Sequence, residues 1–132
     1  MRGITVREIF GRYVHAGALS RDADALAELF TEDGVLEAPL VPAGHPFPRV
    51  MVGREAIREG MAEYYRRPAG APGVVDTARS SFVVHDTADP DVFIAEIDTV
   101  VDGATASLVQ IVRLRDGKIT RLRDYFAPDT LA

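Results

Sequence analysis

The sequence predicts an α+β fold, with three helices in the N-terminal half packed on a curved antiparallel or mixed β-sheet from the C-terminal half. Three observations predict it. Apolar residues recur at helical spacing in three segments before residue 67. From residue 74 onward the chain consists of strand-like runs. Asp-Gly pairs at 102–103 and 116–117 lie between such runs, and this pair is the strongest short-range signal for a β-hairpin. Helices followed by an antiparallel meander are typical of the α+β class.

Each helix has a recognisable start. The segment Thr5–Glu8 is a capping-box pattern, so the first helix is expected over Val6–Ala18. Asp22 can cap a second helix, which we expect to end at Asp33-Gly34. A third helix is expected over Arg54–Arg66. The inward faces of the second and third helices would carry Leu26, Leu29, Phe30, Ile57, Met61 and Tyr64.

The strands follow from runs bounded by turn residues. The expected strands are Val35–Ala38, Val74–Asp86, Val92–Val101, Ala106–Leu114 and Lys118–Phe126. The segment Pro39–Val50 holds four prolines and one glycine, so it is expected to be a loop.

Composition limits the possible functions. A chain of 132 residues with 47% hydrophobic and 27% charged residues is expected to form one globular domain over residues 1–132. Its net charge of −5 argues against a nucleic-acid partner, and no apolar run is long enough for a membrane span. There is no cysteine, and His15, His45 and His85 lack ligand spacing, so no metal is expected. A cytoplasmic location is the default expectation.

Asp124 is the leading candidate for a functional residue. Side chains alternate along a strand, so Asp124 shares a face with Leu122 and Phe126. A carboxylate on an apolar face is costly to bury unless it has a partner or a function. We therefore interpret Asp124 as a general acid or base whose pKa is raised by an apolar pocket, with a hydrogen-bonded structural aspartate as the alternative.

Three stretches carry a resemblance to a known family: ALAELFTEDGVLEAPL (25–40), VGREAI (52–57) and RDGKITRLRDYFAP (115–128). They resemble the SnoaL-like branch of the NTF2-like superfamily, and the resemblance covers nearly the whole chain. It implies a cone-shaped pocket between three helices and a curved sheet. It also implies a homodimer, since proteins of this branch are usually dimeric. The same scaffold serves isomerases, cyclases, epoxide hydrolases and non-catalytic binders, so function has to be argued from the site.

The last strand is similar to that of limonene epoxide hydrolase, whose catalytic-strand aspartate falls on Asp124. That family has an Arg-x-Asp pair where this chain has Glu96 and Asp98, so the aspartate is kept and the arginine is not. Its water-holding tyrosine and asparagine fall on Leu36 and Ala38. The catalytic set of that family is therefore incomplete here.

Two other members match in part. The phenazine-biosynthesis A/B proteins resemble the chain in DPDVFIAEID (89–98), but their active-site histidine falls near Gly60. In ketosteroid isomerase, Tyr13 would take the place of the oxyanion tyrosine. Its two aspartates fall on Ala38 and Gln110, which excludes that assignment.

The direction of Glu96 and Asp98 is open at this point. Strand periodicity places Phe93 and Ala95 on the core face and leaves both acids in solvent. The resemblance to the hydrolase places the acids inside, and Asp98 is the acid more expected to face inward. Val83, Ile97 and Val109 would then form a homodimer contact through the sheet.

These observations favour a cofactor-independent enzyme performing acid–base chemistry, such as cyclisation, isomerisation or water addition to an epoxide. The substrate would be a small, largely apolar organic molecule. A non-catalytic small-molecule binder or scaffold is the alternative. The expected catalytic residues are Asp124, Asp98 and Glu96. The expected substrate-binding residues are Tyr13, Phe30, Met61, Tyr64, Gln110 and Phe126.

Overall fold

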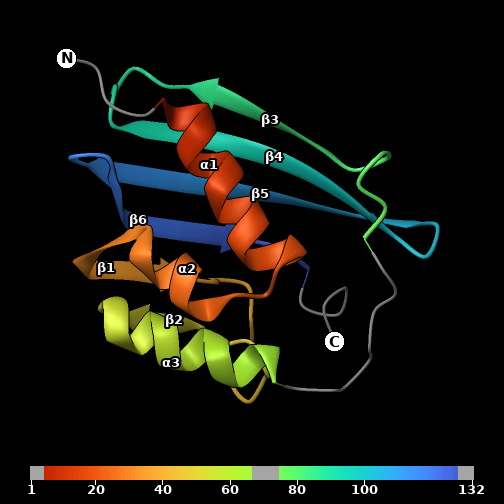
Figure 1. The fold of residues 1–132 in the computed structure, drawn as a ribbon, viewed down its shortest axis with the longest axis horizontal. Helices are drawn as coiled ribbons and strands as arrows, with labels where there is room; N and C mark the ends of the chain where they lie inside the picture. Colours follow the sequence, from red (N-terminus) through yellow and green to blue (C-terminus); the bar gives the residue numbers. More distant parts are fainter. Residues whose placement is uncertain (1–4, 67–74, 128–132) are drawn as a thin grey trace.

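Three helices and a short π-helical segment pack on one face of a six-stranded mixed sheet (Figure 1). The computed structural model describes residues 5–66 and 75–127. The helical elements are α1 (Val6–Val14), η1 (His15–Leu19), α2 (Ala23–Glu28) and α3 (Arg54–Tyr65). The strands are β1 (Phe30–Glu37), β2 (Val50–Val52), β3 (Ser81–Asp86), β4 (Val92–Val101), β5 (Ala104–Arg115) and β6 (Lys118–Tyr125). The predicted α+β class is confirmed.

The sheet has the strand order β2-β1-β6-β5-β4-β3. Strands β1 and β6 run parallel, and every other neighbouring pair is antiparallel. Both predicted Asp-Gly turns are present: Asp102 and Gly103 have φ of 52° and 80°, and Asp116 and Gly117 have 53° and 77°. Positive φ at both turn positions matches the twist of the strands that the turns connect. These turns set β4, β5 and β6 side by side.

The first helix begins as the sequence predicts. The Thr5 hydroxyl accepts a hydrogen bond from the Glu8 backbone amide (3.1 Å), and the Glu8 carboxylate accepts one from the Thr5 amide (3.2 Å). The α-helix ends at Val14, and the helical path continues as η1 to Leu19. Helix α1 buries Ile9, Phe10 and Tyr13 against the sheet.

The second predicted helix is wrong at its C-terminal end. Helix α2 stops at Glu28, and Phe30 opens strand β1 instead of completing a helical face. Phe30 pairs with Ile119 of β6, and the Ile119 amide donates to the Leu29 carbonyl (2.8 Å). This parallel pairing explains the difference, because it joins segments far apart in the sequence. The register shifts between Phe30 and Val35, so Asp33-Gly34 lies within an irregular strand.

The structure differs from two further predictions about strands. The segment expected to be a loop up to Val50 leads into the short edge strand β2, which pairs antiparallel with β1. Strand β3 begins at Ser81 and is shorter than predicted, because residues 76–80 form a turn closed by hydrogen bonds to Asp76. Val74, the predicted start of that strand, lies outside the described residues.

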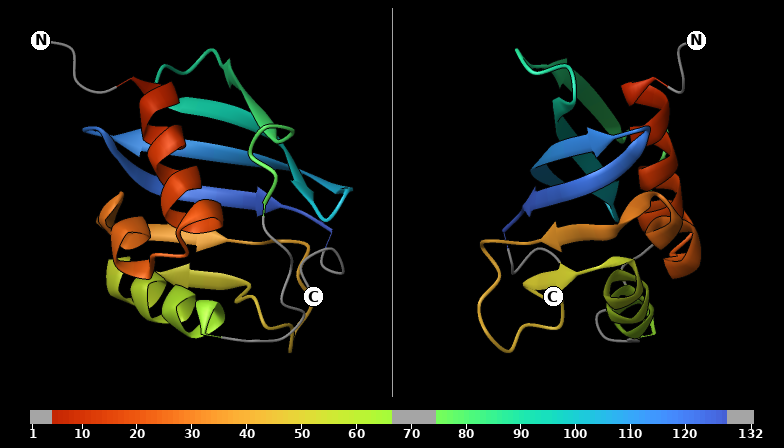
Figure 2. Two further views of the ribbon diagram at one scale, coloured as in Figure 1. Left: turned by 45° about the vertical axis from the view of Figure 1, so that its right-hand side comes forward. Right: turned by 90° about the vertical axis from the view of Figure 1, so that its left-hand side faces the viewer.

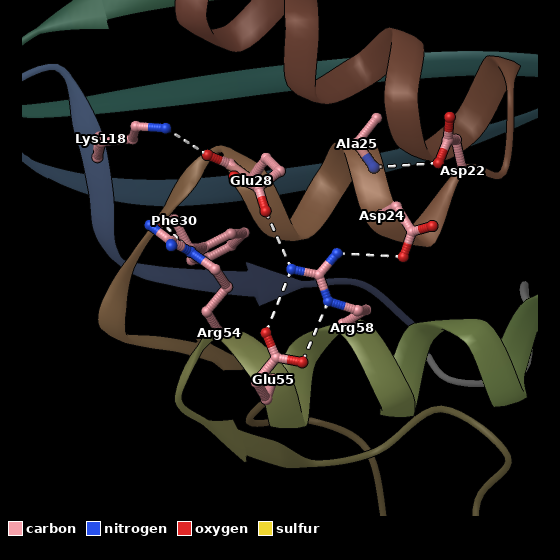
Figure 3. Close-up of polar contacts among 9 residues, drawn as sticks. All are labelled: Asp22, Asp24, Ala25, Glu28, Phe30, Arg54, Glu55, Arg58 and Lys118. Carbon is pink, nitrogen blue, oxygen red and sulfur yellow. Dashed lines mark hydrogen bonds and ion pairs between the residues drawn. The ribbon is translucent and has the colours of Figure 1, made fainter.

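An arginine on α3 ties it to α2 (Figure 3). Arg58 forms ion pairs with Asp24 (3.1 Å) and Glu28 (3.0 Å) of α2 and with Glu55 of its own helix (3.3 Å). One turn away, Arg54 donates two hydrogen bonds to the Phe30 carbonyl, 2.7 and 3.1 Å long. These contacts fix the start of β1 relative to both helices.

The helices cover only one face of the sheet (Figure 2). The core lies between that face and the helices, with Phe10, Phe30, Phe93, Leu36 and Leu122 fully buried. Valines are exposed on the other face, among them Val83 and Val109. Within the described parts of the chain, no helix is long and apolar enough to cross a bilayer.

Candidate functional site

The site is built around Asp124, whose side chain points into the core. Asp124 is 7% exposed and lies on the β6 face that also carries the fully buried Leu122. Phe126, which follows the strand, is buried on the same side. The prediction that Asp124 faces the apolar side of the sheet is confirmed.

Gln110 lies directly beside Asp124. The two residues are partners in the register between β5 and β6, and Gln110 is in turn the partner of Ala95 on β4. On the other side, Glu37 of β1 is the partner of Arg123, so Ala38 reaches the level of Asp124. Both alanines are fully buried. We call this line across the sheet, Ala38–Asp124–Gln110–Ala95, the polar row, because its two central residues are polar.

Burial changes the acidity of Asp124. It raises the pKa of Asp124 to about 7, and a hydrogen bond from the Gln110 side chain opposes part of that rise. Removing a carboxylate from water disfavours its charged form, which is the cause of the upward shift. Asp124 therefore exchanges a proton near neutral pH, where an acid–base group is most effective.

Two oxygen atoms in the polar row have no hydrogen-bond partner. They are Oε1 of Gln110 and Oδ1 of Asp124, and both are buried. Buried polar atoms in folded proteins are nearly always paired with protein or with ordered water. These two oxygens are therefore available to a water molecule or a ligand.

Tyr13 of α1 is a third polar group near Asp124. Burial and then the negative charge of Asp124 raise the pKa of Tyr13 well above its ordinary value. Its hydroxyl thus stays protonated and can donate a hydrogen bond. The Tyr13 ring packs edge-to-face with Phe30 (centroids 6.4 Å apart).

The other expected substrate-binding residues are also in or against the core. Phe30, Met61 and Phe126 are buried, and Tyr64 is partly buried against them. Phe47, which the sequence did not indicate as a site residue, lies between two of them. Its ring centroid is 5.0 Å from that of Tyr64 and 5.3 Å from that of Phe126. No local pattern signals Phe47, since it lies in the proline-rich segment.

The structure does not bring Glu96 and Asp98 to Asp124. Both acids are exposed on the opposite face of the sheet, so the expectation that Asp98 faces inward is wrong. Glu96 pairs with His85 (2.5 Å), and Asp98 accepts a hydrogen bond from Ser107 (2.6 Å). The physical reason is simple alternation: Phe93 and Ala95 take the core positions of β4 and leave the even-numbered acids outside.

Sequence reasoning missed Tyr65, a neighbour that also helps to raise the pKa of Tyr13. Burial raises the pKa of Tyr65 to about 12. Its hydroxyl lies close to Gly17, where an added Cβ would be 3.4 Å away. The adjacent tyrosines at 64 and 65 are a weak signal, because helical periodicity alone assigns only Tyr64 to the inward face.

Two open grooves lie elsewhere on the described surface. One, of about 530 Å³, is formed by α1, η1 and α2 and includes Gly11 and Leu29. The other, of about 510 Å³, includes Arg21 and Tyr65 at the end of α3. Neither is lined by Asp124. In the described ranges, no three His, Asp or Glu side chains gather as a metal site would require.

Comparison with known proteins places this geometry in a family. Residues 10–122 match the family model of the SnoaL-like domain. The chain is 32% identical over 123 residues to an uncharacterised PhzA/B-like protein of Pseudomonas aeruginosa, covering 87% of this chain and 81% of that protein.

Solved structures agree with this match. An isomerase candidate from Bacillus subtilis is similar with a TM-score of 0.69 and 28% identity, covering 92% of this chain and 86% of that one. The phenazine biosynthesis-related protein phzb2 of Pseudomonas aeruginosa has a TM-score of 0.64 at 23% identity, covering 92% and 78%, and shows the fold alone. The chain belongs to the SnoaL-like family, within the NTF2-like fold.

Proposed function

We propose that this protein is a cofactor-independent enzyme that moves a proton on a small, largely apolar organic molecule, with Asp124 as the acid–base group. The observation that carries the proposal is a carboxyl group held in an apolar core with its pKa raised to about 7. A group that ionises near the working pH can both accept and return a proton at a useful rate. Isomerisation and cyclisation by proton transfer both need such a group.

The neighbours of Asp124 suggest which residue would carry out each step of the reaction. Asp124 removes a proton from carbon, and the electrons move onto an oxygen of the substrate. Tyr13 stays protonated and can donate a hydrogen bond to that developing oxyanion. Asp124 then returns the proton to a different atom, so no redox partner is required.

The similarity to an isomerase candidate from Bacillus subtilis supports this class of reaction. The positions of Glu96 and Asp98 narrow the range of reactions further. Glu96 and Asp98 lie on the outer face, so the second acid–base role falls to Tyr13 in this proposal. Water addition to an epoxide is correspondingly less favoured, because no second carboxyl among the described residues faces Asp124.

A generic carbon acid tests the proposal without knowledge of the substrate. 2-Tetralone loses a proton next to its carbonyl, and exchange of that proton in D₂O is followed by NMR. Wild-type protein is expected to accelerate the exchange, and Asp124→Asn to reduce the acceleration about 10²–10⁴-fold. Asp98→Asn, with its carboxyl on the outer face, is the matched control and should keep it. Equal exchange by wild type and Asp124→Asn contradicts the proposal.

A second candidate function is a non-catalytic binder or scaffold that assembles through its sheet. Val83 and Val109 are 52% and 37% exposed on the uncovered face. Isolated exposed valines are common, but here two belong to one sheet face that no described helix covers. A homodimer that packs these faces together would bury them, and this association is compatible with either function.

A further inference from the structure

We propose that the polar row binds the ammonium group of a small organic amine, so that the site of the proposed function is selective for amine-bearing ligands. This inference rests on the proposed function for the identity of the site. It adds the chemical class of the ligand.

The atoms left without a hydrogen-bond partner are of one kind. Gln110 Oε1 and Asp124 Oδ1 are both acceptors, and both belong to buried side chains on the core face. They come from residues that are direct partners across β5 and β6. A ligand that satisfies both must bring hydrogens on nitrogen or oxygen. A carbonyl or carboxylate placed directly against these two oxygens would add a further acceptor to two that are already unsatisfied.

Asp124 has no positively charged partner among the described residues. Burial and the Gln110 hydrogen bond are the influences on the acidity of Asp124, and no cation contributes. Over residues 5–66 and 75–127, no Lys, Arg or His forms an ion pair with Asp124. The nearest arginines in sequence, Arg121 and Arg123, lie on the outer face and pair with Glu37 (2.6 and 3.5 Å).

A buried carboxylate without a counter-charge is costly, and an ion pair with hydrogen bonds offsets that cost. An ammonium group supplies both the charge and the hydrogens. An alcohol supplies the hydrogens alone, and an anion is repelled.

The side chains around the polar row are small or aromatic. The polar row ends in Ala38 and Ala95, the smallest side chains that a strand can carry without glycine. Tyr13 and Phe30 present aromatic rings on the helix side of the core. Aromatic faces attract cations, and most strongly where water is excluded. The side chains around the carboxylate therefore suit a positive group with an apolar body.

Three ligands that differ only in their polar group provide the test. They are cyclohexylmethylamine, cyclohexylmethanol and cyclohexanecarboxylate, and their binding to the full chain is measured by calorimetry and by NMR. Above neutral pH we expect the amine to bind roughly tenfold or more tightly than the alcohol, because hydrogen bonds to charged groups are about twice as strong as neutral ones. The carboxylate should bind least.

The pH dependence adds an independent readout. Tyr13 of α1 and Tyr64 and Tyr65 of α3 are tyrosines that pack against this region from the helices. Burial raises the pKa of Tyr13 and Tyr65, so both stay neutral at these pH values. Amine affinity should therefore fall about tenfold for each unit of pH below about 7, where Asp124 becomes protonated. Alcohol affinity should change much less.

Single substitutions test whether the amine binds at the polar row. Asp124→Asn should remove the preference for the amine over the alcohol, and Gln110→Leu should weaken the amine while leaving some preference. Glu96→Gln, on the outer face, should change neither. An amine that binds no tighter than the alcohol overturns the proposal, and so does a preference that survives in Asp124→Asn.

The two proposals fail in different ways. If 2-tetralone exchange depends on Asp124 but the amine has no advantage, the ligand class is wrong and the enzyme proposal stands. If the amine preference depends on Asp124 but no exchange occurs, the polar row is a binding site and the enzyme proposal fails.

Discussion

Gln110 and Asp124 are direct partners across β5 and β6, and each retains one buried oxygen without a hydrogen-bond partner. The Gln110 side chain donates a hydrogen bond to the Asp124 carboxylate, which has no hydrogen to donate to Gln110 Oε1. The pair therefore leaves acceptor oxygens in the core, and one of them belongs to a carboxyl group whose pKa is raised to about 7. This arrangement connects the fold to a function, because it combines an exchangeable proton with unsatisfied hydrogen-bonding groups.

The stability of the protein should fall as the pH rises through the pKa of Asp124. In the folded chain the pKa is about 7, above the ordinary value of 3.8, so between these values the folded state holds a proton that the unfolded state has lost. The contribution of this group to stability is therefore present at low pH and lost as pH rises through about 7. From about pH 5 to pH 8 we expect a loss of roughly 2–3 kcal/mol from this group.

Urea unfolding of wild type and Asp124→Asn at both pH values isolates that contribution. The asparagine variant lacks the ionisable group, so its stability should depend less on pH. Parallel pH curves for the two proteins would mean that Asp124 titrates normally in the folded state.

The rate of 2-tetralone exchange should follow the ionised fraction of Asp124. Only the carboxylate can remove a proton, so the rate should rise with pH and level off above about 7. Tyr13 remains protonated over this range and should not end the plateau. A rate that levels off near pH 4 would assign the base to an ordinary, solvated carboxyl group.

The sequence predicts correctly the face of the sheet on which Asp124 lies. It predicts less well which residues surround that side chain. Alternation along β6 suffices to place Asp124 with Leu122 and Phe126, since it depends only on the strand being a strand. The same rule correctly left Glu96 and Asp98 outside, and the resemblance to a hydrolase was the misleading signal.

Long-range pairing explains the remaining differences. Leu26, Leu29 and Phe30 have helical spacing, but the parallel pairing of Phe30 with Ile119 converts the last of them into a strand residue. The polar row likewise depends on the register of four strands, which no local pattern specifies. Strand β2 has only three residues, too few for alternation to be detected.

Removal of the Arg58 side-chain charge should weaken the contact between α2 and α3. Arg58→Met keeps the apolar stem but removes the ion pairs with Asp24, Glu28 and Glu55. We expect a lower urea midpoint, and a smaller difference from wild type in concentrated salt, where exposed ion pairs are screened.

Arg66→Met is the matched control, because Arg66 pairs with Glu63 within a single helix. Its effect on the urea midpoint should be small. An equal loss in both variants would show that the link between the two helices has no special role.

The outer face of the sheet should hold two copies of the chain together. Val109 lies on β5, near the middle of the strand order, with Glu96 and Tyr125 as its partners on either side. Val109→Lys places a charge where a sheet-to-sheet contact would exclude water, and burying a charge is costly even beside the Glu96 carboxylate. We expect dimerisation to weaken at least about tenfold, measured by analytical ultracentrifugation across a wide range of concentrations.

Leu40→Lys is the control for surface charge. Leu40 is 55% exposed but follows β1 and lies outside the sheet. Its substitution should leave association unchanged. A wild-type protein that sediments as a monomer at every concentration would contradict the proposed dimer. Equal weakening by both lysine variants would place the contact elsewhere than the sheet face.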